Sequence, residues 1–580
     1  MRAAEMPVGF ARGIRLRGLI GLAALVAPLA TVPLIPGMVD QLPTAALFLS
    51  YSFGRMAAAY GLSLAFALGY GYLAATRRSY ERILLPILDI LQSVPILGFF
   101  PAAVIFFVSL TGPGSILGPN LASIFLIFTS MSWNMAFGVY ESVRGIPPDL
   151  REASAAFGLK GPSRLRRLFL PATVNRLVYN SILSWTAGWF FLVAAEIIST
   201  QVTLPGIGSY LYSAAQADNA PELLAGLLVL GLLIVAMDLL LWHKLSAWAE
   251  RFRYDQAPSG EVGGPGTPLS TGLSGRVGRA AGWMARGFVS GVSRVRAPLV
   301  SLRTVTVGRF RRGPDHRPST LSRSAVYYTA LGVVLVLGWL ALIAISVELF
   351  RLFSGPITPA VATNLRLLPL AALFSLTRVV GAYALCLAIT LPLAIGFARS
   401  RRATRYGLPV VQIVASFPAT ALFPLFLVVL LAPLGGETVA ILFLITGMVW
   451  YLFFNLYSGL RSLPPDLEEA GRSLGLKGRT YYRRFVLPGI FSAFVTGSIT
   501  AFGGGWNTLI LAEYLGVGGG TSHLQLLGLG EFIDIGWATQ PQGLVLMAGA
   551  LLTMIAVVIT LNEVIWKPLY RRASTRYRYD

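Results

Sequence analysis

Two carboxylates lie inside long apolar segments of this 580-residue chain, at matching points of an internal repeat. Glu196 ends the run WFFLVAAE, and Glu513 ends the related run WNTLILAE. An ionised carboxylate in such a segment must be paired or must face an aqueous path. One interpretation is therefore a gate or pathway group. The other is a structural carboxylate, capped by backbone amides or paired with Arg55 or Arg378, and the residue types alone leave both open.

Other polar and aromatic side chains of the apolar segments are further pathway candidates, although such residues more often serve packing. They are Gln92, Asn134, Asn180, Trp189 and Trp506. A phosphate loop is excluded because none of the four lysines is followed by Ser or Thr. The single cysteine, Cys386, and three scattered histidines argue against a disulfide or a metal cage. We therefore expect no catalytic residue, metal site or bound cofactor in this chain.

The composition places most of these segments in a bilayer. Charged residues make up 12% of the chain and hydrophobic residues 55%, whereas soluble domains carry about 25% charged residues. Such a chain cannot cover a globular surface with charge, so most side chains must face lipid or one another. A soluble enzyme, a disordered tail and a disulfide-rich scaffold are excluded.

Twelve apolar runs of about 20 residues or more predict an all-α membrane protein with about twelve transmembrane helices. They lie near residues 17–37, 56–76, 83–110, 120–143, 173–199, 222–248, 325–350, 372–398, 406–432, 437–460, 489–514 and 543–566. The first run follows several arginines and imitates a signal peptide. With eleven further runs behind it, it is interpreted as a retained helix.

The positions of the basic residues decide between two explanations for the net charge of +22. Nucleic-acid binding is one, and the concentration of Lys and Arg in cytoplasmic loops is the other. Clusters of arginine follow the second, fourth, eighth and tenth runs, whereas the connections 111–120 and 433–436 contain no basic residue. We therefore expect a multi-pass protein of the bacterial inner membrane, with both termini cytoplasmic, lipid as its surroundings and no nucleic-acid partner.

The chain contains two copies of a six-span unit. A shift of 323 residues aligns Arg55 with Arg378, and a shift of 317 aligns Trp189 with Trp506. We predict a first unit over residues 1–250, a basic cytoplasmic linker over 251–323 and a second unit over 324–580. The linker holds 13 arginines and three acidic residues, which fits a solvated connection or a helix on the anionic inner leaflet. Parallel repeats predict a pseudo-two-fold axis along the membrane normal, with a path between the units.

The strongest match between the copies is the segment after the fourth span of each unit. Residues 149–171 read DLREASAAFGLKGPSRLRRLFLP, residues 466–488 read DLEEAGRSLGLKGRTYYRRFVLP, and 12 of 23 positions are identical. Prolines before each copy can start a short helix, and a glycine can end it. This predicts a short helix across the cytoplasmic face. It either docks into a partner's groove or serves as a rigid elbow.

The segment resembles the EAA loop of binding-protein-dependent ABC importer permeases. That family's pattern is Glu-Ala-Ala, three residues, Gly, nine residues, an apolar residue, one more residue, and Leu-Pro. Both copies keep every spacing, and the third Ala is replaced by other small residues. The matching positions are Glu152, Ala153, Ser154 and Gly158 in the first copy, and Glu469, Ala470, Gly471 and Gly475 in the second.

The flanking residues resemble the nitrate/sulfonate/taurine-type permeases. The similar segments are 189–196 with 205–208, 506–513, and 89–95, together with Arg55 and Arg378. The second unit departs from that pattern over residues 412–418 and in a longer, glycine-rich segment over 515–541. These departures indicate that the two units are not equivalent.

The resemblance implies two tandem six-helix type I ABC importer permease units. It implies that the loop helices couple to two cytosolic ATP-binding subunits, which bind ATP and Mg²⁺, and that an extracytoplasmic binding protein delivers the solute. The solute would be small, polar and anionic, such as nitrate, a sulfonate, taurine or bicarbonate. The alternatives are a fused ferric iron or thiamine permease and a twelve-span secondary carrier in which Glu196 or Glu513 carries protons.

Overall fold

The computed structural model describes residues 35–252 and 357–576, apart from 94, 113, 160, 200–203 and 515–525. The chain forms two compact units, one of residues 1–270 with 363–580 and one of residues 271–362. Residues 271–362 are described only over 357–362. The architecture below is therefore that of residues 35–252, which we call the first half, and of the described residues from 357 to 576, which we call the second half. The predicted spans 17–37 and 325–350 and the linker lie almost entirely outside the described residues.

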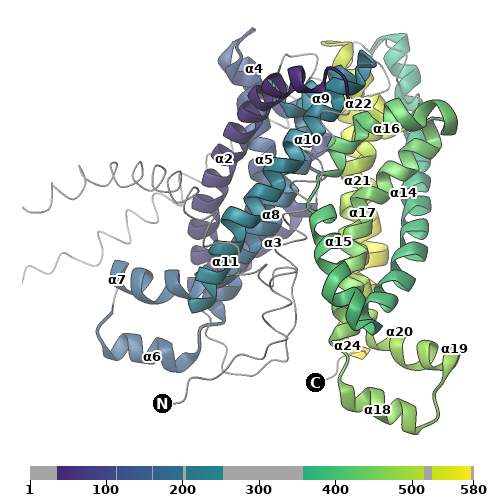
Figure 1. Ribbon diagram of the computed structural model, residues 1–580. Coiled ribbons are helices and arrows are strands. Elements are labelled where there is room, and N and C mark those ends of the chain that lie inside the picture. The colour runs from purple at the N-terminus through teal and green to yellow at the C-terminus, as the bar shows by residue number, and fades with distance from the viewer. Residues whose placement is uncertain are drawn as a thin grey trace, which may run out of the picture. The chain divides into compact units, whose positions relative to one another are not determined.

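Every regular element of the described residues is helical, which confirms the predicted all-α class (Figure 1). Seven helices are long and apolar enough to cross a membrane, some of them together with a short helix that continues them. They are α2 (Met38–Thr76), α5 (Leu117–Arg144), α8 (Leu170–Ile198), α10 (Ala220–Met237), α14 (Pro359–Arg399), α17 (Gly436–Arg461) and α23 (Leu544–Leu561). An eighth long helix, α21 (Phe491–Tyr514), follows a 67° bend.

Two of the predicted spans are broken rather than continuous. Residues 83–110 form α3 (Arg78–Ser93), the short η2 (Leu97–Phe99) and α4 (Phe100–Thr111). Residues 406–432 form α15 (Leu408–Ala415) and α16 (Ala419–Leu434), and this pair is bent by 81°. Pro95 and Pro418 lie at the two breaks. Proline disfavours helical geometry in the residue before it and cannot donate a backbone hydrogen bond, so each helix stops there.

Within each half, glycine allows the central helices to approach closely. In the first half, a Cβ atom on Gly188 of α8 would overlap Met131 of α5. In the second half, a Cβ atom on Gly505 of α21 would overlap Met448 of α17. Gly188 and Gly505 are equivalent in the repeat, as are Met131 and Met448. The same small-residue packing therefore joins the same pair of helices twice, as is common between membrane helices.

The loop segments form short helices beyond the spans, as predicted from their prolines. Each begins at the second proline of a pair and is followed by a tight turn and a π-helical turn that leads back to the long helix. The elements are α6 (Pro148–Ala156), α7 (Pro162–Arg164) and η3 (Leu165–Phe169) in the first half, and α18 (Pro465–Ser473), α19 (Gly478–Tyr481), η8 (Tyr482–Val486) and α20 (Leu487–Gly489) in the second.

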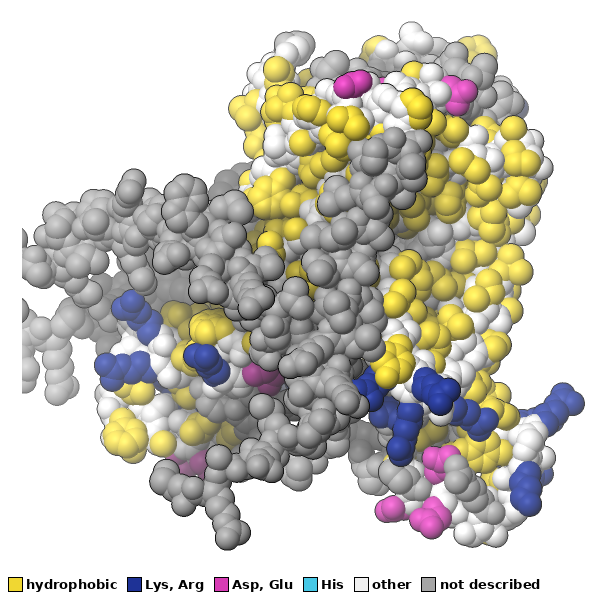
Figure 2. All heavy atoms as spheres, viewed as in Figure 1, with side chains coloured by type: hydrophobic (Ala, Val, Ile, Leu, Met, Phe, Trp, Pro, Cys, Tyr) yellow, Lys and Arg dark blue, Asp and Glu magenta, His cyan; other side chains and the backbone are white. Residues whose placement is uncertain are grey.

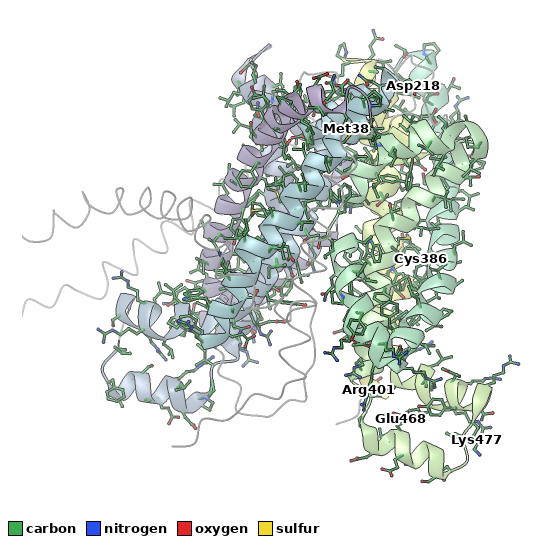
Figure 3. All side chains as sticks on the ribbon, in the orientation of Figure 1. Met38, Asp218, Cys386, Arg401, Glu468 and Lys477 are labelled. Atoms are coloured by element: carbon green, nitrogen blue, oxygen red, sulfur yellow. The ribbon has the colours of Figure 1, made fainter. Side chains whose placement is uncertain are left out.

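The two ends of the helical bundle differ in charge. Figure 3 shows Arg401, Glu468 and Lys477 at one end, beside α18 and α19, and Met38 and Asp218 at the other. Figure 2 shows Lys and Arg side chains gathered near the loop helices, with hydrophobic side chains along the flank of the long helices. We call the end that carries α6 and α18 the basic end, and the end that carries Asp218 the acidic end.

The remaining helices complete the two halves in the same order. A short helix follows the long helix that leaves the loop, and a final long helix then ends in a π-helical turn and a polar extension. These elements are α9 (Ile207–Gln216), η5 (Asp238–Trp242), α11 (His243–Ala249) and η6 (Glu250–Phe252) in the first half, and α22 (Leu529–Ala538), η9 (Asn562–Trp566) and α24 (Lys567–Arg576) in the second.

Candidate functional site

The two loop helices expose equivalent carboxylates and apolar tips. Glu152 and Glu469 are exposed on α6 and α18. At the end of each helix an apolar side chain projects into solvent, with Phe157 83% exposed and Leu474 80% exposed. Phe157 and Leu474 hold equivalent positions of the repeat, so both loops present an apolar tip at the same place.

A glycine in the left-handed region ends each loop helix. Gly158 has a φ of +67° and Gly475 a φ of +74°. The next residue closes the helix, because Leu159 N donates to Ser154 O at 3.0 Å and Leu476 N donates to Gly471 O at 3.1 Å. Glycine adopts this backbone conformation without steric cost. The two predicted glycine positions therefore set the direction in which the chain leaves each helix.

The small residues of the two motifs face the loop itself. Ser154 is buried, and its hydroxyl donates to Arg151 O at 2.8 Å. Gly471 is buried, and a Cβ atom there would lie 3.8 Å from the ring of Phe485. Both small residues are therefore buried within the folded loop. Ala153 and Ala470 are exposed beside the glutamates.

Different contacts hold the two loops to their spans. In the first half, the Arg151 guanidinium donates to Val143 O at 2.7 Å and to Arg144 O at 3.0 Å. In the second, the Arg399 guanidinium at the end of α14 lies 4.7 Å from the ring centre of Tyr482. The loops are therefore alike in shape but not in their attachment, which agrees with the expectation that the halves are not equivalent.

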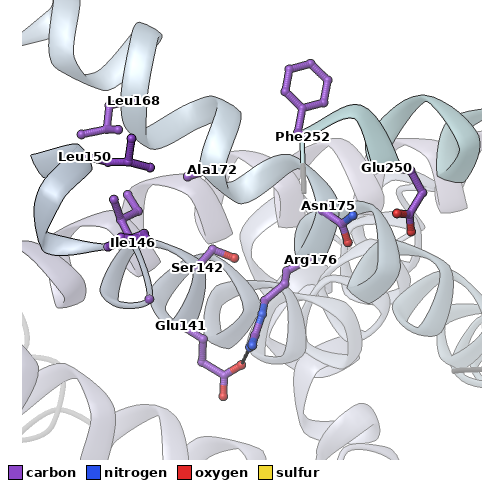
Figure 4. A pocket seen from close by; sticks show the side chains of 12 residues that line it. Glu141, Ser142, Ile146, Leu150, Leu168, Ala172, Asn175, Arg176, Glu250 and Phe252 are labelled. Atoms are coloured by element: carbon purple, nitrogen blue, oxygen red, sulfur yellow. Dashed lines mark hydrogen bonds and ion pairs between the residues drawn. The ribbon is translucent and has the colours of Figure 1, made fainter. Parts of the chain in front are cut away.

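A cavity of about 280 Å³ lies at the basic end of the first half, where the loop joins the spans (Figure 4). Leu150 of α6, Ser142 of α5 and Asn175 of α8 are among its lining residues. Glu141 and Arg176 form an ion pair in its wall. The cavity thus lies beside the junction of the loop helix with the ends of α5 and α8.

Glu196 lies in a buried cluster that joins three segments of the first half. It is 0% exposed and accepts hydrogen bonds from Arg55 Nη1 at 2.6 Å and Ser52 Oγ at 2.7 Å, both in α2. Its other oxygen accepts from Gly208 N at 2.8 Å, in the first turn of α9. Arg55 Nη2 also donates to Pro205 O at 2.5 Å. The alternative that this carboxylate is paired with Arg55 and capped by a backbone amide is confirmed.

The second half repeats the cluster with equivalent residues. Glu513 is 1% exposed and accepts from Arg378 Nη1 at 2.7 Å and from Gly530 N at 3.0 Å. Ser375 Oγ donates to both of its oxygens, at 2.9 and 2.8 Å. Arg378 Nη1 also donates to Leu527 O at 2.8 Å. We call the group Ser52, Arg55, Glu196 and Gly208 the first Arg–Glu cluster, and Ser375, Arg378, Glu513 and Gly530 the second.

One partner differs between the two clusters. Arg55 Nε donates to the neutral side chain of Asn120, at 2.7 Å. At the equivalent place Arg378 donates through two nitrogens to the carboxylate of Glu437, at 2.7 and 2.6 Å. Arg55 therefore has one carboxylate partner and Arg378 has two, of which Glu437 is 59% exposed.

Of the other pathway candidates, Asn134 and Asn180 contact each other, since each Nδ2 donates to the backbone oxygen of the other residue, at 3.3 and 3.1 Å. Trp189 and Trp506 are buried, and the Trp189 indole N–H has no hydrogen-bond partner within the described residues. Asn134 Nδ2 donates to Ser184 Oγ at 3.2 Å and joins α5 to α8 inside the first half. Gln92 is exposed near the end of α3. The structure does not bring all of these side chains into one site.

Sequence reasoning missed a polar contact between the halves. Leu97 N, at the break of the first half, donates to Asn507 Oδ1 of α21 at 3.2 Å. Thr420 Oγ1, at the break of the second half, donates to Phe190 O of α8 at 3.0 Å. The repeat contained a signal for this contact, because polar Asn507 takes the position that apolar Phe190 holds in the first half.

The short helices α9 and α22 carry ionisable residues at equivalent positions. Burial raises the pKa of Tyr212 in α9, and the negative charge of Asp534 in α22 raises it further against the hydrogen bond with Gln216. Tyr212 and Asp534 hold equivalent positions of these two helices.

Comparison with known families agrees with this repeated arrangement. A profile described as binding-protein-dependent transport system inner membrane component matches residues 67–242 and again residues 388–567. The chain belongs to this family. Because the match occurs once in each half, the chain consists of two fused permease units. It is a multi-pass inner-membrane transport component of ABC type.

Several relatives of this chain are named as transport permeases. The bicarbonate transport system permease protein CmpB of Synechococcus elongatus is 22% identical over 201 residues, which are 35% of this chain and 66% of the relative, just under two thirds of its length. A probable ABC transporter permease of Brucella abortus is 26% identical over 229 residues, which are 37% of this chain and 87% of the relative. The nitrate import permease protein NrtB of Synechococcus elongatus is 22% identical over 169 residues, which are 29% of this chain and 54% of the relative.

Proposed function

We propose that this chain is the transmembrane permease subunit of an ATP-driven importer, with its translocation path between the two halves. Membership of the binding-protein-dependent family supports this function. The observation that carries it is the pair of equivalent loop helices that project from the basic end. A secondary carrier has no use for two such exposed helices.

The loop helices are the docking sites of two cytosolic ATP-binding subunits. Glu152 with Phe157, and Glu469 with Leu474, give each helix an acidic side and an apolar tip that can enter a partner's groove. The ATP and Mg²⁺ bind to those subunits. On this proposal the basic end and both termini are cytoplasmic, and the positive-inside bias supports that orientation.

A small polar anion is the proposed solute, and an extracytoplasmic binding protein delivers it to the acidic end. The relatives named for bicarbonate and for nitrate support an anion of this size. The cross-half contacts at Leu97 and Thr420 lie at the two broken spans. Broken helices at a repeat interface are typical of solute sites in transporters, so the path passes these breaks.

Affinity purification of the tagged chain in mild detergent, followed by intact-complex mass spectrometry, tests the assembly. We expect two ATP-binding subunits for each copy of this chain. Two identical or two different subunits both support the proposal, because the two loops differ in attachment. A lone chain that transports its solute without ATP would overturn it in favour of a carrier.

A quadruple variant tests the docking residues. Glu152→Lys and Glu469→Lys with Gly158→Val and Gly475→Val should release the ATP-binding subunits, while the spans stay folded. Glu563→Lys, a charge reversal at an exposed glutamate outside the loops, is the control. Uptake of bicarbonate, nitrate and a sulfonate into proteoliposomes then identifies the solute. Full coupled transport by the quadruple variant would contradict the docking assignment.

A further inference from the structure

We propose that the two Arg–Glu clusters transmit movement of the loop helices to the acidic end, so that Glu196 and Glu513 are positioning residues of transport. This inference rests on the proposed coupling to ATP-binding subunits. It assigns to both carboxylates a mechanical role in place of solute contact or proton transfer. The argument follows the chain from the loop to the far end of α8 and from there to the other half.

The first step is a continuous helix between the loop and the cluster. The first loop runs through α7 and η3 directly into α8, which is helical from Leu170 to Ile198. At 1.5 Å per residue, its 29 residues extend for about 43 Å. A helix of this length without a break moves nearly as a rigid rod. Displacement of α6 therefore displaces Glu196, near the other end of α8.

The second step is the attachment of α9 to the end of α8. Gly208 N, in the first turn of α9, donates to Glu196 Oε2 at 2.8 Å. The adjacent Ile207 N donates to Ser52 Oγ at 2.8 Å, and that hydroxyl itself binds Glu196. Gly206 packs so closely that a Cβ atom would overlap the carboxylate. The start of α9 is thus held by side-chain bonds as well as by the connecting chain.

The third step is the contact between α9 and the other half. Helix α16 of the second half packs against both α8 and α9. When α8 carries α9 with it, the contacts that close the acidic end between the halves must change. In the second half Glu513 joins α21 to α22 through Gly530 in the same way, but a 67° bend lies between α21 and its loop helices.

The carboxylates are unsuited to bind the solute. Glu196 Oε1 already accepts from Arg55 and Ser52, and Oε2 accepts from Gly208. The side chain is fully buried, and its negative charge would repel an anion. Glu513 is occupied in the same way. Their full hydrogen-bond complement fits a joint between helices better than an open binding site.

The test compares coupling in the purified complex with and without the clusters. Glu196→Gln with Glu513→Gln should lower solute transport at least tenfold, while ATP hydrolysis stays within about threefold of the parent. Asp238→Asn neutralises an acidic residue outside both clusters, at the start of η5. This control should leave the rates of transport and of ATP hydrolysis near the parent values. A parallel fall of ATP hydrolysis and transport would mean a structural role only and would overturn the proposal.

A milder pair of substitutions tests the same clusters with less risk of misfolding. Ser52→Ala with Ser375→Ala removes one donor from each carboxylate and keeps both ion pairs. We expect solute transport to fall to a value between those of the parent and the Gln pair. Fewer solute molecules should move per ATP, and the amount of assembled complex should be normal. An unchanged ratio of transport to hydrolysis in this pair, together with an unchanged ratio in the Gln pair, would also overturn the proposal.

The labelling rate of an introduced cysteine measures the movement between the two halves. With Cys386→Ala as background, Ala421→Cys places one thiol in the first turn of α16, where the parent side chain is fully buried. Its rate of labelling by a membrane-impermeant maleimide should differ between the nucleotide-free and vanadate-trapped complexes. The Gln pair should abolish that difference, and a retained difference would count against the clusters. Absence of ATP-driven transport in the parent would instead count against the proposed function.

Discussion

Leu97 and Asn507 form a hydrogen bond between the two halves, with Leu97 N donating to Asn507 Oδ1 at 3.2 Å. The residues equivalent to them are Thr420 and Phe190, which also form a hydrogen bond, at 3.0 Å. The same contact thus occurs twice, each time between the break of one half and the long central helix of the other. Only the first contact places a side-chain amide there.

Asn507→Asp should lower anion uptake at least tenfold and leave ATP hydrolysis nearly unchanged. The aspartate keeps an oxygen for Leu97 N, but it adds a negative charge to the proposed path. Two like charges about 7 Å apart repel by about 2 kcal/mol at an effective dielectric constant of 20. Proteoliposome uptake measures the effect. Asn455→Asp, whose parent amide bonds within α17, is the control, and normal anion uptake by Asn507→Asp would contradict a path at this contact.

Glu196→Gln should destabilise the chain more than Glu513→Gln. Without Glu196, buried Arg55 keeps only neutral partners, and an unpaired buried charge costs about 3–5 kcal/mol. Without Glu513, Arg378 keeps both hydrogen bonds to Glu437, so we expect a loss of about 1–3 kcal/mol. Unfolding in graded mixtures of mild detergent and SDS gives both values.

Glu437→Gln provides the matched control for this difference. When Glu437→Gln is added to Glu513→Gln, Arg378 loses its second carboxylate partner. The free energy of unfolding should then fall by as much as it does in Glu196→Gln. Equal stabilities of the two single variants would show that the Asn120–Glu437 difference has no energetic effect.

Gly206→Ala and Gly528→Ala should each disturb the neighbouring cluster. The backbone at both glycines is extended, so alanine fits the conformation, but its Cβ atom would overlap Glu196 or Glu513. Such overpacking costs about 1–3 kcal/mol. Gly69→Ala, with open space around it in α2, should show no loss. Thermal stability in detergent distinguishes them, and equal stability of all three would argue against tight packing on the carboxylates.

Gly158→Val should weaken recovery of the ATP-binding subunits more than Gly158→Asn. Nothing lies within 4 Å of the added Cβ atom, so the effect arises from the left-handed backbone alone. That conformation costs most residues about 1–2 kcal/mol, whereas asparagine tolerates it. The yield of subunits that co-purify with the chain is the measurement. Gly54→Val in α2 should have no effect, and equal yields from Val and Asn at position 158 would exclude a backbone cause.

Local features of the sequence predicted the loop helices and most of the spans. Apolar runs of sufficient length give membrane helices because unpaired backbone groups are too costly in lipid. Proline and glycine mark the ends of α6 and α18 for reasons that involve only neighbouring residues. The same reasoning, applied to Pro95 and Pro418, would have predicted the two breaks, but the apolar runs continue across them.

The sequence by itself determined that this protein is a repeated, all-helical membrane permease with two loop helices and no phosphate loop of its own. It also named Arg55 and Arg378 as possible partners of Glu196 and Glu513, because a carboxylate in lipid needs a partner. Only the tertiary structure selected that pairing, added Gly208 and Gly530, and joined Leu97 to Asn507. These bonds link residues distant along the chain, and their geometry depends on how whole helices rotate and pack, which no local pattern specifies.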